Sequence, residues 1–300
     1  MNVFRVRGGE FGNWMTDKDR QASLDFGYDA FCDLADVLDI AIADISFNGK
    51  LAIAFGARGS GNARAHYEPD LKVINLTKLK GAGSLAHEWG HALDDYISEA
   101  LGVTTTKLFS ETRLITEEQR SLLPEFSELL HNLKYKTILT EDGKEKTVKT
   151  DFLKGSIKFD SCHSKQENGY WQSRPEMFAR AFDCYVSDKL KELNRRSDYL
   201  TAHANCYKTF DTDGSIIYAY PRGEERKQIN ESFDILFDAL KNKRILHKKT
   251  TSIDRVLSEQ KKEKDSISFP RQKTDYSCYN QLSLEDVFGS DFVVGKNKII

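Results

Sequence analysis

Apolar residues recur at helical spacing, three and four positions apart, in several stretches of the chain. These stretches are residues 17–38, the segment "GAGSLAHEWGHALDDY" continuing to about Leu101, the segment from Pro175 to about Leu193, and "QINESFDILFDALKNK". The stripe in residues 17–38 consists of Leu24, Tyr28, Phe31, Leu34 and Leu38. Gly102, directly after the second stretch, is typical of a helix C-terminus. The pattern therefore predicts four helices, with a further helical piece near residues 117–133.

Shorter apolar runs bounded by turn residues predict strands between these helices. We expect a hairpin in "ISFNGKLAIAF", with Asn48-Gly49 as its turn, and a second strand pair in "AHYEPDLKVINL", broken at residues 68–70. A third, polar hairpin is expected in "KTILTEDGKEKTVKT", turning at Asp142-Gly143. Helices and short strands mixed along the chain predict an α+β fold with a small mixed sheet.

The pattern weakens after residue 247, where the chain becomes polar and rich in lysine. Such a segment buries too little apolar surface to fold by itself, so we expect residues 248–300 to form a polar C-terminal tail or linker. Residues 1–247 are predicted to form one domain. Within it, the mixed segment 103–170 is expected to be an insertion or lid-like region.

Composition narrows the class of protein. The 300 residues are 39% hydrophobic and carry a formal net charge of −2, which argues against a protein that coats nucleic acid. No apolar run is long enough to span a membrane, and the first residues show no signal peptide. The five cysteines are scattered and form no CxxC pair. We therefore expect a cytoplasmic protein without a membrane partner.

The segment "GAGSLAHEWGHALDDY" carries the clearest candidate chemistry. His87 and His91 are four residues apart, so both imidazoles face the same side of a helix and can reach one zinc ion. Glu88 lies beside them, where it could act as general base on a water molecule. The alternative is a pair of ordinary structural histidines. The apolar residues around them favour a metal site, because buried imidazoles need partners.

A catalytic zinc site needs a third protein ligand. Asp94 lies too far along the helix, and Ile97 excludes the extended motif with a third histidine. Asp94 and Asp95 either accept the outer N–H of a histidine or are ordinary acids on the helix surface. A second helix offers Glu176. That residue also completes a capping box with Ser173, which leaves its role open. Further alternatives for the third ligand are Asp183, Asp188 and His66.

Several segments together resemble a known family. They are "FGNW", "RQASLDFGYDAFCDLADVL", "LAIAFGARGSGNARAHYEP", "VINLTKLKGAGSLAHEWGHALDDY", "SRPEMFARAFDCYVSDKL" and "AYPRGEERKQINESFDILFDAL". From Phe11 to Leu240 the chain resembles the large polyvalent protein-associated domain family of phages and conjugative elements, which looks like a zincin-type metallopeptidase. The resemblance implies a zincin-like fold, with an active-site helix carrying H-E-x-x-H and a second helix that supplies Glu176 as the third ligand.

The expected function is hydrolysis of peptide bonds in a protein or peptide substrate, with Zn²⁺ as cofactor and Glu88 as base. Tyr220 is the expected donor to the developing oxyanion, with Tyr218 and His203 as alternatives. We expect the substrate to extend along "KVINL" as an edge strand.

The alternative function is a catalytically idle module that binds DNA or a host protein, and a delivered toxin is a third possibility. An intact Glu88 favours the enzyme, because an idle site needs no base. The basic run from Lys241 to Lys264 gives weak support for nucleic-acid binding. "GARGSGNARA" lacks the G-K-[ST] of a phosphate loop and is expected to shape the cleft.

Overall fold

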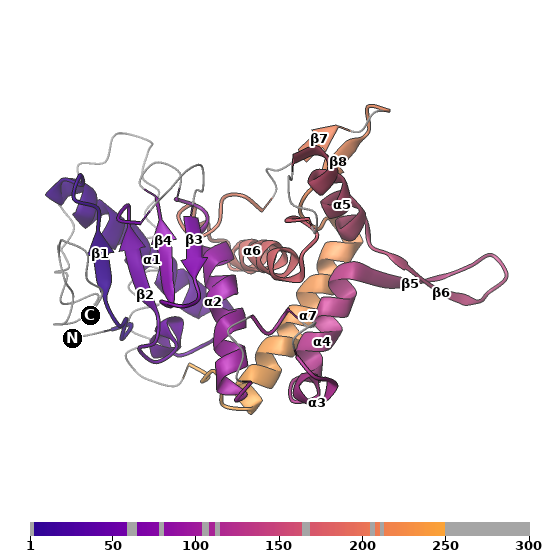
Figure 1. The fold of residues 1–300 in the computed structure, drawn as a ribbon, viewed down its shortest axis with the longest axis horizontal. Helices are drawn as coiled ribbons and strands as arrows, with labels where there is room; N and C mark the ends of the chain where they lie inside the picture. The colour runs from indigo at the N-terminus through magenta and orange to yellow at the C-terminus, as the bar shows by residue number, and fades with distance from the viewer. Residues whose placement is uncertain are drawn as a thin grey trace. The chain divides into compact units, whose positions relative to one another are not determined.

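A computed structural model describes residues 3–58, 65–77, 81–103, 108–111, 115–163, 169–204, 208–210 and 213–249 (Figure 1). These residues form seven α-helices and three small sheets, which confirms the predicted α+β class. They gather into two compact units. Of the described residues, unit 1 contains those in 1–85, 190–200 and 246–249, and unit 2 contains those in 86–189 and 201–245. Each unit is described by itself below.

Unit 1 is built on a four-stranded mixed sheet. The strands are β1 (Gly9–Phe11), β2 (Ala52–Phe55), β3 (Ala65–Glu68) and β4 (Val73–Leu76), in the order β1-β2-β4-β3. β2 pairs in parallel with β1 and β4, whereas β3 pairs antiparallel with β4. The predicted strand pair in "AHYEPDLKVINL" is therefore confirmed.

The prediction that "KVINL" forms an edge strand is wrong. Its strand β4 lies between β2 and β3, and all four of its residues are buried. Burial of every residue is typical of a strand covered on both faces. The expectation failed because it paired β2 with the residues before it in the chain, although β2 takes both of its partners from elsewhere.

The hairpin predicted around Asn48-Gly49 is also wrong. The residues before the turn form a 3₁₀-helix, η1 (Ile42–Ser46), instead of a strand. Asn48 and Gly49 do turn the chain, with φ values of 55° and 90°, and the Ser46 hydroxyl accepts a hydrogen bond from the Gly49 N–H at 3.0 Å. Ile42 and Ile45 are buried three residues apart, as in a 3₁₀-helix. Over so few residues, the apolar pattern does not distinguish such a helix from a strand.

The first helix, α1 (Asp17–Leu38), has the predicted bounds. Thr16 and Asp19 form a capping box at its start. The helix packs against β2 at Gly27, where an added Cβ would lie 3.4 Å from the Phe55 ring. Its last turns carry Asp33 and Asp36, which pair with the buried Arg195 guanidinium at 2.7 and 2.6 Å.

The chain returns to unit 1 after its last helix. The His247 carbonyl accepts a hydrogen bond from the Ala41 N–H at 2.8 Å, Lys248 forms a β-bridge with Ile40, and Lys249 pairs with Asp36. Lys248 and Lys249 are thus attached to unit 1. The rest of the predicted tail, including "LSLEDVF", lies outside the described residues, as do residues 59–64 of the glycine-rich loop.

Unit 2 is a group of helices around α6 (Arg174–Glu192), which Figure 1 shows between α2 (Leu85–Ala100) and the pair α4 (Pro124–Lys134) and α7 (Gly223–Asn242). Aromatic contacts join these helices. The ring centroid of Phe178 on α6 lies 5.1 Å from that of Phe126 on α4 and 5.5 Å from that of Phe233 on α7. Phe182 stacks on Trp89 of α2, with 5.5 Å between ring centroids. The core of this unit therefore lies along α6.

The predicted helices of unit 2 are confirmed, and Gly102 ends α2 with a φ of 69°. The piece expected near 117–133 is two helices, α3 (Glu117–Arg120) and α4. Two hairpins complete the unit: β5 (Tyr135–Leu139) with β6 (Glu145–Lys149), as predicted, and β7 (Lys208–Phe210) with β8 (Ile216–Tyr218). Figure 1 shows β5 and β6 extending away from the helices. The lid-like role of residues 103–170 stays a prediction.

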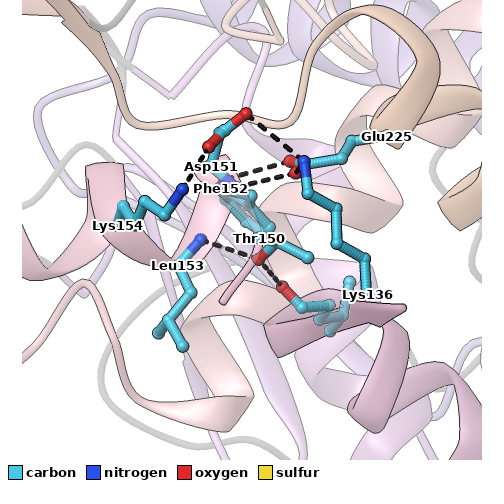
Figure 2. A network of polar contacts seen from close by, with 8 residues as sticks. Lys136, Thr150, Asp151, Phe152, Leu153, Lys154 and Glu225 are labelled. Carbon is cyan, nitrogen blue, oxygen red and sulfur yellow. Dashed lines mark hydrogen bonds and ion pairs between the residues drawn. The ribbon is translucent and has the colours of Figure 1, made fainter. Parts of the chain in front are cut away.

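Helix α5 (Asp151–His163) was not predicted. Its start is held by a polar network, shown in Figure 2. The Thr150 hydroxyl accepts the Leu153 N–H at 3.0 Å, and the Glu225 carboxylate of α7 accepts the N–H groups of Asp151 and Phe152 at 2.7 and 3.1 Å. Carboxylates stabilise a helix N-terminus in this way. The cap comes mainly from a residue 74 positions away, so the local sequence does not reveal it.

Candidate metal centre

Helix α2 holds His87 and His91 on one side of a rigid, buried element. The surrounding apolar side chains are at most 1% exposed, which confirms the expected burial of the motif: Leu85, Ala86, Trp89, Ala92 and Leu93. His91 itself is 9% exposed. Because the core fixes the backbone and the rotation of this helix, the two imidazoles are held in a defined direction.

Gly90 lets α6 approach α2 closely. A Cβ at this position would lie 3.1 Å from Cδ1 of Phe182 and 3.4 Å from Cα of Ala179, both on α6. Glu176 lies on α6 one turn before Ala179, and its carboxylate reaches the two histidines. The sequence analysis did not assign this role to Gly90, because only the packing of the two helices reveals it.

Two imidazole nitrogens and both carboxylate oxygens of Glu176 converge where the helices meet. His87 Nε2 and His91 Nε2 are 3.2 Å apart, and they lie 3.5 and 3.4 Å from Oε2 and Oε1 of Glu176. Ligand atoms about 2.0–2.1 Å from a tetrahedral zinc ion are separated by about 3.3–3.4 Å. The separation of the two imidazole nitrogens, and the distance from each of them to one Glu176 oxygen, are close to this value. Within the described part of the chain, this is the one group of three or more such residues spaced to hold a metal ion.

The electrostatics of the group also suit a cation. Burial lowers the pKa of His91, but Glu176, Glu88 and Asp94 together more than offset this and raise it to about 9. Burial raises the pKa of Glu176, yet His91 and His87 together bring it well below its usual range. Without a metal, the site thus replaces part of the missing positive charge with a proton on His91. Among the described residues, Glu176 Oε2 has no hydrogen-bond partner.

Glu88 is buried, with 6% of its surface exposed, and it lies close enough to His91 to raise the pKa of that imidazole. Tyr170 is a neighbour that the sequence analysis missed. Its hydroxyl hydrogen bonds to Glu176, and its pKa is raised by burial and by the charges of Glu176 and Glu88. Tyr170 comes from the loop before α6, so no spacing rule relates it to the histidine motif.

Two more carboxylates are fully buried next to the histidines. Burial raises the pKa of Asp94 to about 7, and its Oδ1 accepts the Ser110 N–H at 2.8 Å. Burial raises the pKa of Asp183 to about 6, while the nearby His87 acts to lower it. Asp94 therefore holds a loop, and Asp183 lies beside His87. Asp95, the other residue expected behind the histidines, is half-buried.

The structure places the other candidate residues elsewhere. Asp188 forms a two-point ion pair with Arg226, at 2.6 and 2.8 Å. His66 pairs with Glu68 in unit 1 at 3.2 Å. Tyr220 lies in a buried cluster with Phe159, Cys184, Ala204 and Ala219. Tyr218 lies under the Arg222 guanidinium at 3.8 Å. The oxyanion role of Tyr220 stays a prediction.

The described residues thus define an α+β protein with a buried cluster of two histidines and one glutamate. Residues 162–244 match the model of a known family, large polyvalent protein-associated domain 1. This match confirms the resemblance over a stretch that contains Glu176, whereas His87 and His91 lie before it. No curated protein and no solved structure matches the chain. None of the helices in the described ranges has the length and apolar content needed to cross a bilayer.

Proposed function

We propose that this protein is a zinc-dependent metallopeptidase of the Glu-zincin type, encoded by a mobile genetic element. The observation that carries the proposal is the convergence of His87 Nε2 and His91 Nε2, 3.2 Å apart, on the Glu176 carboxylate, with each nitrogen 3.4–3.5 Å from one of its oxygens, beside the buried Glu88. A carboxylate close to both imidazoles is not expected if the two histidines are paired by chance. The match to the large polyvalent protein-associated domain supports the assignment to phages or conjugative elements.

His87, His91 and Glu176 would hold the ion through two nitrogens and one oxygen, which leaves room for a fourth ligand. Zinc in such a site lowers the pKa of a water molecule to about 7 and polarises a carbonyl group. Burial keeps the three side chains in place, so little reorganisation is needed when the ion binds.

Glu88 is the general base in this proposal. It follows His87 directly on α2, so its carboxylate points to the side of the group instead of into it. From there it would take a proton from the attacking water and pass it to the leaving amine. The substrate is a protein or peptide. Because β4 is an interior strand, an extended substrate cannot pair with it, and the earlier expectation for "KVINL" is not part of the proposal.

The test compares purified wild-type protein with Glu88→Gln and with Glu99→Gln. Glu99 is an exposed acid on the same helix, so it controls for the loss of one negative charge. We expect all three proteins to contain zinc in near 1:1 ratio by elemental analysis. Comparison of the peptides released from a proteome should show that Glu88→Gln lowers hydrolysis at least about 100-fold, whereas Glu99→Gln retains it.

Full activity in Glu88→Gln would refute the assignment of the base. A wild-type protein that holds zinc but cleaves nothing would instead favour the idle module that binds DNA or a host protein. A wild-type protein without affinity for zinc would refute both the metal site and the peptidase.

A further inference from the structure

The loop that leads into α6 is held by side chains on both sides. The Asp160 carboxylate of α5 accepts the N–H groups of Trp171 and Gln172 at 2.7 and 2.9 Å. On the carbonyl side, Lys134 Nζ donates to the Gln172 oxygen at 3.1 Å, and Arg180 of α6 donates to the Trp171 oxygen. This short loop carries Tyr170, and Glu176 follows it in the first turn of α6.

Arg180 connects this loop to three other segments. Its Nε donates to the backbone oxygen of Glu176 at 3.2 Å, and its two terminal nitrogens donate to Ser156 Oγ at 3.2 Å and to the Ala219 oxygen. The side chain is only 2% exposed. A single guanidinium therefore links the backbone of Glu176 to the loop, to α5 and to the segment after β8.

The surroundings of Arg180 are unusual for a buried cation. Among the described residues, no carboxylate lies within ion-pair distance of it. The rings of Phe152 and Trp171 are each 5.1 Å from the guanidinium carbon, and that of Tyr220 is 6.0 Å away. Arg226, also buried in unit 2, instead has Asp188 as a two-point partner. The partners of Arg180 in the described part of the chain are thus aromatic rings and four neutral oxygens, three of which belong to the backbone.

We propose that Asp160 and Arg180 form a clamp that positions Glu176 and Tyr170 for metal binding. This inference rests on the proposed function, because it concerns the same metal centre. Asp160 holds the N–H side of the loop and Arg180 holds its carbonyl side, which restrains the loop from both sides. Arg180 also donates to the carbonyl of Glu176, so the same guanidinium joins the loop to the turn of α6 that carries this side chain. Neither clamp residue touches the ion or the substrate.

The test uses Arg180→Lys, Arg180→Met and Asp160→Asn, with Arg226→Lys as a matched control. Lysine keeps the charge of Arg180 but cannot reach four acceptors at once. Mutation of residues that hydrogen bond to metal ligands typically lowers metal affinity by about 10–100-fold. We expect the Arg180 variants to bind zinc at least about 10-fold more weakly in a chelator competition, and Asp160→Asn to weaken binding in the same direction. Arg226→Lys should lower thermal stability and leave zinc affinity within about 2-fold of wild type.

Cobalt(II) provides a second readout that a merely structural role would not change. Its visible absorption reports the geometry of its ligands, so the clamp variants should show an altered spectrum while the control matches wild type. Measurements are made at a temperature where circular dichroism shows each variant to be folded.

Wild-type zinc affinity and an unchanged cobalt spectrum in folded Arg180→Lys would overturn the clamp and leave the proposed peptidase intact. If the Arg180 variants do not fold, Asp160→Asn decides: wild-type affinity and spectrum in that variant also overturn the clamp. Absence of zinc binding in the wild type is a different result, because it refutes the metal centre itself.

Discussion

Two carboxylates in unit 2, those of Glu225 and Glu176, lie in contrasting environments. Both belong to the first turn of a long helix and both are largely buried, with side chains 10% and 14% exposed. The oxygens of Glu225 accept two backbone N–H groups and the Lys136 ammonium, all within 3.1 Å (Figure 2). Glu176 instead faces two imidazole nitrogens, and its Oε2 has no hydrogen-bond partner in the part of the chain that the structure describes.

The difference distinguishes a carboxylate that stabilises the fold, Glu225, from one that is suited to be a metal ligand, Glu176. The hydrogen-bonding capacity of the Glu225 carboxylate is met by donors within the protein, so this residue needs no bound ion. The Tyr170 hydroxyl also hydrogen bonds to Glu176, but the lone pairs of neutral imidazoles and a carboxylate repel one another, so we expect a proton or another cation between the imidazole nitrogens and the carboxylate. Burial with unsatisfied acceptors is costly, so such a group is expected where a cation binds.

The largest expected effect is that of Glu176→Gln on zinc binding. Glutamine keeps the size of the side chain and can still cap the helix, but it removes the anionic ligand atom. Zinc affinity should fall by more than roughly 100-fold, which is the upper range for losing a residue that only hydrogen bonds to a metal ligand. Equilibrium dialysis against wild type and Ser173→Ala measures this. If Ser173→Ala lost zinc and Glu176→Gln did not, Glu176 would be a capping residue only.

Glu225→Gln should produce a smaller effect, and in a different quantity. Hydrogen bonds to a charged group contribute about 1.5–3 kcal/mol, so we expect a loss of about that size in the free energy of unfolding, measured in urea. Zinc affinity should stay unchanged. Glu224→Gln is a suitable control, since Glu224 is its exposed neighbour on α7. A weaker zinc site in Glu225→Gln would show that the two carboxylates are not independent.

The most gradual effect concerns pH. In the metal-free protein the pKa of His91 is raised from 6.5 to about 9, so its contribution to stability is fully present below pH 6.5 and is lost as the pH rises through 9. The raised pKa values of Asp94 and Asp183, about 7 and 6, act in the same direction at lower pH. Metal-free protein should therefore become less stable between pH 6.5 and 9 in thermal unfolding.

Zinc-loaded protein should show the opposite trend over the same interval, because the ion displaces the His91 proton and binds more tightly as that proton is lost. Glu176→Gln serves as the comparison, since it removes the charge that raises the pKa of His91. Parallel pH profiles for the loaded and metal-free protein would contradict this account of the site.

The sequence was sufficient for the parts of the site that local geometry determines. The spacing of His87 and His91 on a helix and the apolar residues around them predicted their orientation, and that prediction agrees with the structure. Glu176 required a resemblance, because its own sequence reads equally well as a helix cap. Tyr170, Asp160 and Arg180 were missed, since their contacts join the loop before α6 to segments that no spacing rule connects.

The fold shows the same limit. Helices with a long apolar stripe, such as α1 and α6, were predicted to within a residue or two at each end. Strands of four residues carry too little pattern to reveal their partners, so the hairpin at Asn48-Gly49 and the edge position of "KVINL" were wrong. Helix α5 was missed because charged residues and Gly155 interrupt its apolar pattern, and its cap comes from Glu225.

In the proposed metal centre, we expect Gly90 to influence which ions fit between α2 and α6. The two helices touch where it has no side chain, and the donor atoms come to lie 3.2–3.5 Å apart. That spacing suits a small ion about 2.0–2.1 Å from its ligands, whereas calcium requires about 2.3–2.6 Å and more oxygen atoms. A Cβ at position 90 would lie 3.1 Å from Cδ1 of Phe182, so this ring would have to shift slightly, whereas the 3.4 Å distance to Ala179 Cα is ordinary contact. We therefore expect Gly90 to favour ions with short metal–ligand distances.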